Sequence, residues 1–422
     1  MKYTLFDGIS VGIAGMIGGG IFLLNGVVVK NNRKFAPLSW FYGFIICFFI
    51  VFSYIILSIE FPNKYGTILY PKLLMKNNSS KIISGLIIYL GYLVLISVYS
   101  VSLSNYVSEY MNIINYKTLI SFLCILVSII ISYLPDNSFM KLLNNLVIIK
   151  VLIFILIIFI GILTPFKINK NTNLKLKYNK GNISKISQFS ILLFGFKIFL
   201  SYEGFEMISN MSENMKNLER NIPLSYILST TIVALVYIGL SYVTNKHIGN
   251  ELNETNQYSS IINLTKKYGN RFVSPIIIVL LCIIANISAI NASMFTNDLI
   301  IENYFEQLSL PNKIKDFFNK DINLPFFQKS KKIYVWFGFI ISSMLILLPE
   351  KTIINLGSLL FLISFGIIGY VGYLLINRKE SKDDPVLILN KKIPYSICKI
   401  ISIISIIICI IGGIILIVNI RK

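Results

Sequence analysis

Two apolar stretches, each long enough to cross a membrane, are interrupted by residues that do not suit a continuous membrane helix. The first runs from about Leu5 to Val29 and contains Gly18-Gly19-Gly20, and the sixth runs from about Ser187 to Met211 and contains the polar segment 201–206. Hydrocarbon offers no partner to freed backbone groups, so such breaks persist only beside a cavity or a neighbouring helix. Because they come at equivalent places five spans apart, they predict a transporter with inverted repeats and a substrate site at the breaks.

The composition is that of a polytopic membrane protein. The 422 residues are 55% hydrophobic and 14% charged, which is too apolar for a soluble protein of this size. The net charge of +20 would suggest nucleic acid in a soluble domain, but nearly all the lysines lie in short loops between apolar runs. We therefore expect anionic head groups, and not nucleic acid, as neighbours of these lysines.

Apolar runs of roughly 20 residues indicate about eleven spans. They are Leu5–Val29, Pro37–Phe61, Ile82–Val107, Thr118–Leu134, Phe139–Leu163, Ser187–Met211, Pro223–Val243, Phe272–Asn297, Tyr334–Leu348, Ile353–Ile376 and Ser396–Ile420. Lysine and arginine are spread too evenly between alternate loops for charge alone to predict the orientation. The first span has full membrane length, so we expect it to remain in the mature protein rather than be removed as a signal peptide.

Cysteine and histidine give no support to metal or nucleophile chemistry. The only histidine is His247, in a loop, and the five cysteines lie in apolar runs without ligand spacing. We expect no metal, no cofactor and no enzymatic activity.

The chemistry of the breaks suits a zwitterion. An unwound glycine triplet lets a second half-helix begin at about Ile21, where free amides attract a carboxylate, while carbonyls near Met16-Ile17 attract an ammonium group. The second break, 200–205, adds carbonyls and a phenol on the opposite wall. The predicted substrate site comprises Met16, Ile17, Gly18, Gly19, Gly20, Ile21, Leu200, Ser201, Tyr202, Glu203 and Gly204. The alternative is that the glycine triplet is only a face for close helix packing.

Ionisable groups within the spans have two interpretations each. Lys150 either extends toward head groups or acts as a proton carrier or fixed cation, which makes it the predicted coupling residue. Lys197 either extends to the interface or pairs with Glu203 or an acidic substrate. Glu206 is expected to tune charge or gating together with Lys197, and Glu60 to make a helix-end or gating contact.

At this point the sequence resembles the amino acid–polyamine–organocation (APC) permeases. Residues 17–22, Ile-Gly-Gly-Gly-Ile-Phe, are similar to the I-G-x-G-I-F signature of that family's first helix, and 199–206 to its F-x-A-Y-x-G-F-[DE] segment. The loop 213–223 is similar to E-E-x-K-N-P-x-R-x-I-P, although Leu218 replaces the proline and Asn214 the second acidic residue. The likeness covers roughly residues 5 to 377.

The resemblance implies an all-α, LeuT-like fold in which two inverted five-helix repeats, 5–163 and 187–377, form a core over 1–377. The segment 378–422 would be a linker and one peripheral helix where twelve-span relatives have two. It also implies a cytoplasmic N-terminus and a multi-pass location in the cell membrane. The substrate carboxylate would meet the amides of the glycine triplet, and the amino group would meet carbonyls near Met16 and at 200 and 203.

The expected function is secondary transport of an amino acid by alternating access. Lys150 matches a fifth-helix lysine that, in proton-coupled relatives, takes the place of a sodium ion, so the resemblance favours a proton as coupling ion. An amino acid/polyamine exchanger, with Glu203 and Glu206 as counter-ions, and a non-transporting sensor or accessory subunit are the alternatives.

Overall fold

The computed structural model describes residues 2–165, 188–254, 256–268, 275–307, 316, 320–322 and 331–420. In its first half the helices are α1 (Leu5–Met16), α2 (Gly19–Asn32), η1 (Arg33–Phe35), α3 (Ala36–Glu60), η2 (Gly66–Ile68), α4 (Leu69–Leu74), α5 (Asn78–Met111), η3 (Ile114–Tyr116), α6 (Lys117–Ser132) and α7 (Asp136–Leu163).

The second half continues with α9 (Gln188–Lys197), η4 (Phe199–Tyr202), η5 (Phe205–Asn214), α10 (Leu218–Ile248), η6 (Gln257–Ser259), α11 (Ser260–Tyr268), α12 (Pro275–Gln307), α14 (Ile333–Leu345), α15 (Glu350–Glu380) and α16 (Tyr395–Ile420). Two short antiparallel hairpins pair β1 (Asp321–Ile322) with β2 (Lys331–Lys332) and β3 (Val386–Ile388) with β4 (Lys391–Ile393).

The prediction of an all-α, multi-pass membrane protein is confirmed. In the described chain each predicted span coincides with a helix or a broken helix, while the first residues of two predicted spans, 187 and 272–274, lie outside the described residues. Eight helices of the described chain are long and apolar enough to cross a membrane, with shorter apolar ones at Leu5–Met16 and Val335–Leu345. Several helices extend past the apolar run, since polar end turns keep their backbone hydrogen bonds outside hydrocarbon. The polar linkers also hold α4 and α11, which hydropathy alone does not reveal.

The first predicted break is present. Helix α1 ends at Met16, and α2 begins at Gly19, two residues before the expected Ile21, so that only Ile17 and Gly18 are non-helical. The helix of the first span is thus interrupted at the beginning of the glycine triplet.

The second break is wider. Helix α9 ends at Lys197, a short 3-10 turn follows as η4, and Gly204 adopts φ 117°, ψ −18° before the 3-10 helix η5. Runs of 3-10 helix longer than one turn are uncommon and often mark hinges. The second half of the sixth span, from Phe205 onward, is therefore a 3-10 helix rather than an α-helix.

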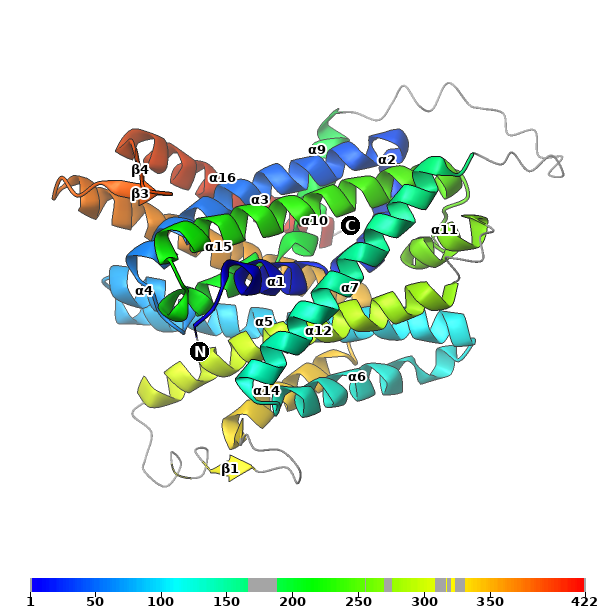
Figure 1. Cartoon of the computed structure of the whole chain (residues 1–422), viewed down its shortest axis with the longest axis horizontal. Helices are drawn as coiled ribbons and strands as arrows, with labels where there is room; N and C mark the ends of the chain where they lie inside the picture. Colours follow the sequence, from blue (N-terminus) through cyan, green and yellow to red (C-terminus); the bar gives the residue numbers. More distant parts are fainter. Residues whose placement is uncertain are drawn as a thin grey trace, which may run out of the picture.

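The long helices lie alongside one another with α1 in the middle of the bundle, as Figure 1 shows. Around α1 pack α7, α10, α12 and η5, and α4 and α11 lie toward opposite ends of the molecule. Helix α16 packs along α15 and α3, so the last span is attached to the bundle by helix–helix contacts. The inverted-repeat relation between the two halves stays a prediction.

Gly204 gives a direct test of the second break. Its positive φ disfavours any side chain, and a Cβ there would lie 2.3 Å from the carbonyl carbon of Gly15. We expect Gly204→Ala to destabilise the protein by about 1–3 kcal/mol, measured as a lower unfolding temperature in detergent. Gly413→Ala is the control, because a Cβ at Gly413 meets nothing within 4 Å. Equal unfolding temperatures for the two variants would contradict this reading of the break.

Candidate functional site

The two breaks touch each other at their backbones. A Cβ on Gly15 would lie 2.8 Å from the Cα of Gly204, and a Cβ on Gly20 would lie 2.7 Å from the Cα of Ser201. Only glycines, which have no side chain, allow two segments of backbone to approach this closely. The residues that the sequence assigned to one site, from spans five apart, therefore lie together in the structure.

The last turn of α1 carries carbonyls that the helix itself cannot satisfy, and three other helices supply donors to them. Tyr99 of α5 donates its hydroxyl to the Gly15 carbonyl at 2.8 Å, and Tyr237 of α10 lies 2.7 Å from the Met16 carbonyl. The same Tyr237 hydroxyl lies 2.8 Å from the carbonyl of Ser201, in the second break. One phenol thus bridges both breaks.

Lys150 of α7 supplies the remaining donors. Its ammonium nitrogen lies 3.3 Å from the carbonyl of Ala14, 3.0 Å from that of Ile17 and 3.0 Å from the hydroxyl of Ser288 on α12. The side chain is fully buried. An ammonium group has three N–H donors, and here each has an acceptor. Lys150 points into the bundle, and the alternative that it extends toward head groups is wrong.

The glycine triplet is also a packing face, as the alternative interpretation expected. A Cβ on Gly18 would lie 2.7 Å from the ring of Tyr99 and 2.8 Å from Ala289, and one on Gly19 would lie 2.8 Å from the Cβ of Ser102. The amide of Gly18 donates to the Met16 carbonyl at 3.0 Å, so close packing is compatible with a role in binding only for the amides of Gly19 and Gly20, which begin α2 and have no acceptor within that helix. Packing must therefore be controlled for in any test of these glycines.

The predicted site residues are buried wherever their side chains are described, except Lys197, which is half-buried. Tyr202 donates its hydroxyl to the carbonyl of Trp40 at 2.9 Å, so it ties the second break to α3. Lys197 lies 4.9 Å from the ring centre of Phe194, and the interpretation that it pairs with Glu203 is wrong because neither carboxylate oxygen of Glu203 has a hydrogen-bond partner in the described chain.

Glu206 and Glu60 have protein partners. One oxygen of Glu206 accepts from the amide of Gly204 at 2.8 Å, and the other accepts from the hydroxyl of Tyr92 at 3.0 Å. Glu206 therefore stabilises the turn of the second break. Glu60, at the end of α3, forms a salt bridge of 2.8 Å with Lys379 at the end of α15, which is the helix-end contact predicted for it.

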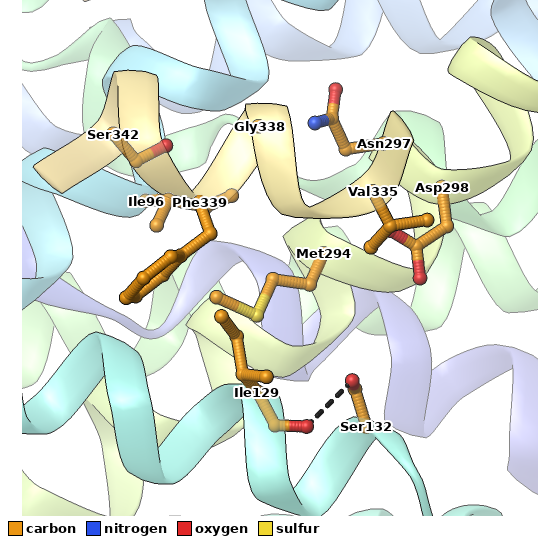
Figure 2. Close-up of a pocket in the computed structure, with 10 residues that line it drawn as sticks. All are labelled: Ile96, Ile129, Ser132, Met294, Asn297, Asp298, Val335, Gly338, Phe339 and Ser342. Atoms are coloured by element: carbon orange, nitrogen blue, oxygen red, sulfur yellow. Dashed lines mark hydrogen bonds between the residues drawn. The ribbon is translucent and has the colours of Figure 1, made fainter. Parts of the chain in front are cut away.

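A small cavity lies elsewhere, between α5, α6, α12 and α14 (Figure 2). Its volume is about 20 Å³, and residues such as Ser132, Met294, Asn297 and Phe339 line it. That is room for about one water molecule, which is too small for an amino acid. None of the predicted site residues lines it, so it is separate from the breaks.

Sequence reasoning missed Tyr99 and Tyr237 as capping residues. A tyrosine inside an apolar run could have indicated such a donor, because a buried hydroxyl group usually needs a hydrogen-bond partner. The chain has 24 tyrosines, however. Which of them face the end of α1 depends on the rotation of each helix, and the sequence does not give that rotation.

Two broken spans that meet at the centre of a multi-pass helical membrane protein are typical of membrane transporters. The comparisons agree with this class. The amino acid permease family model matches residues 3–422, so this chain belongs to that family. The protein is therefore a transporter and not an enzyme.

Named relatives are distant but extend over much of the chain. The inner membrane transport protein YbaT of Escherichia coli is 25% identical over 84% of this chain and 78% of its own length. The uncharacterized amino acid permease YecA of Bacillus subtilis is 24% identical over 57% of this chain and 54% of its own length.

The bridge made by Tyr237 predicts a measurable loss of stability. Tyr237→Phe removes the donor shared by two buried carbonyls, which should lower the free energy of unfolding by about 1–3 kcal/mol. Thermal unfolding of the purified protein measures this loss. Tyr242→Phe, on the same helix with a side chain that is 52% exposed, is the control. The bridge would have no energetic importance if both variants unfolded at the wild-type temperature.

Proposed function

We propose that this permease transports an amino acid by alternating access, with a proton as the coupling ion and Lys150 as the residue that carries it. The α-amino and α-carboxylate groups of the substrate would bind at the two breaks, where helix-end amides and carbonyls complement a zwitterion. The observation that supports coupling most strongly is the position of the Lys150 ammonium among the oxygens of Ala14, Ile17 and Ser288.

The charge state of Lys150 would bias the first break directly. As an ammonium it donates to all three oxygens, which joins α7, the end of α1 and α12. A neutral amine has only two N–H groups, so at least one buried acceptor loses its donor. Protonation would thus favour the arrangement described here, and deprotonation would favour one in which α1 moves away. Oxygen ligands of this kind also suit a sodium ion, but the ammonium already occupies their centre.

We expect transport to depend on a pH gradient and not on sodium, and Lys150→Ala to lose most of the transport together with its pH dependence. Uptake of labelled amino acids into proteoliposomes, with an imposed pH gradient or a sodium gradient, measures both. Lys141→Ala, which removes an exposed lysine from the same helix, is the control. Sodium-driven uptake by the wild type, or an unchanged pH profile in Lys150→Ala, would refute proton coupling through this residue.

The role of the glycine amides can be separated from packing with a paired substitution. Gly19→Ala should clash with Ser102, and the added Ser102→Gly removes the nearest atoms of that clash. We expect the double variant to recover the wild-type unfolding temperature but to bind substrate at least about tenfold more weakly, because the new methyl group stands beside the amides.

Unfolding in detergent and calorimetric titration with amino acids provide the two measurements. Ser102→Gly alone is the control for loss of the serine, whose hydroxyl lies 3.4 Å from the Gly19 carbonyl. Recovery of both stability and binding in the double variant would leave the glycine at this position with a packing role only.

Amino acid/polyamine exchange is the second candidate mechanism, and the observation that favours it is the buried Glu203 carboxylate, which has no partner in the described chain and would serve as counter-ion to an amine. Uptake with and without substrate inside the proteoliposomes distinguishes an exchanger, which needs internal substrate, from a proton-coupled symporter.

A further inference from the structure

The two carboxylates of the second break have different surroundings, although they lie three residues apart. Both oxygens of Glu206 are occupied, one by the amide of Gly204 and the other by the hydroxyl of Tyr92. A carboxylate that already accepts from two protein donors is held in place by the fold. Glu206 is therefore a positioning residue for the break.

Glu203 has no such donors. Its side chain is fully buried, and neither carboxylate oxygen hydrogen-bonds to any residue of the described chain. A carboxylate taken out of water without a partner destabilises a protein by several kcal/mol. Glu203 is thus a strong acceptor whose partner the neighbouring helices do not provide.

The carboxylate lies at the level of both breaks. It directly precedes Gly204, which contacts the backbone of Gly15, and it interacts electrostatically with Tyr99. Tyr99 in turn packs against Gly18 and donates to the carbonyl of Gly15. Glu203 therefore borders the region where the substrate is proposed to bind.

Lys150 in the fifth span and Lys197 in the sixth span itself have other partners. Lys150 donates to the end of α1 and to Ser288, and Lys197 lies over the ring of Phe194. Glu206, whose charge acts on Glu203, has the same sign. The local environment thus favours a positive charge at Glu203 and supplies none from the residues described.

We propose that Glu203 is the specificity-determining residue of this permease and that it selects an amino acid with a cationic side chain. This inference rests on the proposed function, since it assumes that the α-groups of an amino acid bind at the breaks. The ammonium or guanidinium group of the side chain donates to the Glu203 carboxylate, which forms a charge-assisted hydrogen bond in a low-dielectric site. Glu206 does not contact the substrate and keeps Gly204 in its turn.

Lysine and norleucine provide a matched pair of probes, because norleucine has the same four-carbon chain without the ammonium group. In calorimetric titrations of the purified wild type we expect lysine to bind about ten- to a hundredfold more tightly than norleucine. In Glu203→Gln this preference should fall to a fewfold at most, while norleucine affinity stays within a fewfold of the wild type. Glu302→Gln, which removes a carboxylate paired with Lys64 at 3.6 Å, should keep the full preference.

A second variant and a measurement of thermal unfolding distinguish loss of the carboxylate from misfolding of the variant. Glu203→Asp keeps the charge and shortens the side chain, so it should keep a preference for lysine over norleucine. Unfolding without ligand should occur at the wild-type temperature or above it in Glu203→Gln, because the variant removes an unpaired buried charge. Lysine should raise the unfolding temperature of the wild type and of Glu203→Asp, but not that of Glu203→Gln.

The outcomes separate this inference from the function on which it rests. Equal binding of lysine and norleucine by the wild type would overturn the inference, while the proposed transport of amino acids would stand. Loss of pH-dependent uptake in Glu203→Gln with unchanged selectivity would overturn it too, because the carboxyl group would then carry a proton. If none of the common amino acids bound to the wild type, the proposed function itself would fail.

Discussion

The unsatisfied carbonyls at the end of α1 are the constraint on which the arrangement of the bundle depends. A helix that ends within hydrocarbon leaves acceptors that neither water nor lipid can satisfy. Here Tyr99, Lys150 and Tyr237 supply the donors, from α5, α7 and α10 respectively. Each of these helices must be close enough, and rotated correctly, for its side chain to reach the same turn. The break in the first span therefore positions three other spans.

The two breaks are stabilised in different ways, and this difference bears on how each would respond to a change of charge at Lys150. The first depends on side chains from other helices, one of which can gain or lose a proton. The second is stabilised partly from within, by the contact of Glu206 with the Gly204 amide, and partly by neutral side-chain contacts with other helices, such as Tyr202 with the Trp40 carbonyl and Tyr92 with Glu206. In the proposed coupling, a change of charge at Lys150 would act first on α1 and would reach the second break through Tyr237, which contacts both breaks.

The sequence predicted the parts of this structure that local chemistry determines. The glycine triplet and the polar segment 201–206 were sufficient to predict the breaks, and apolar length was sufficient to predict the spans. Helices α4 and α11 were missed because short helices in polar linkers have no hydropathy signal. The different surroundings of Glu203 and Glu206 could not be predicted, because they depend on the turn at Gly204, which directs one carboxylate toward an amide and Tyr92. The capping tyrosines depend on helix rotation in the same way.

Lys150 and Glu203 are groups of opposite charge when ionised, yet Lys150 donates to the end of α1 and to Ser288, while Glu203 has no hydrogen-bond partner in the described chain. If they paired with each other, the carbonyls of Ala14 and Ile17 would lose their donors, and the bundle would lose the contact that fixes α7 to α1. By accepting from Lys150, the carbonyls at the C-terminal end of α1 thus keep its ammonium group from pairing with Glu203. A carboxylate left without an internal cation in a low-dielectric region is a strong source of selectivity, because only a ligand of the right charge can satisfy it. The need to cap one broken helix and the proposed discrimination between substrates would therefore have the same structural origin.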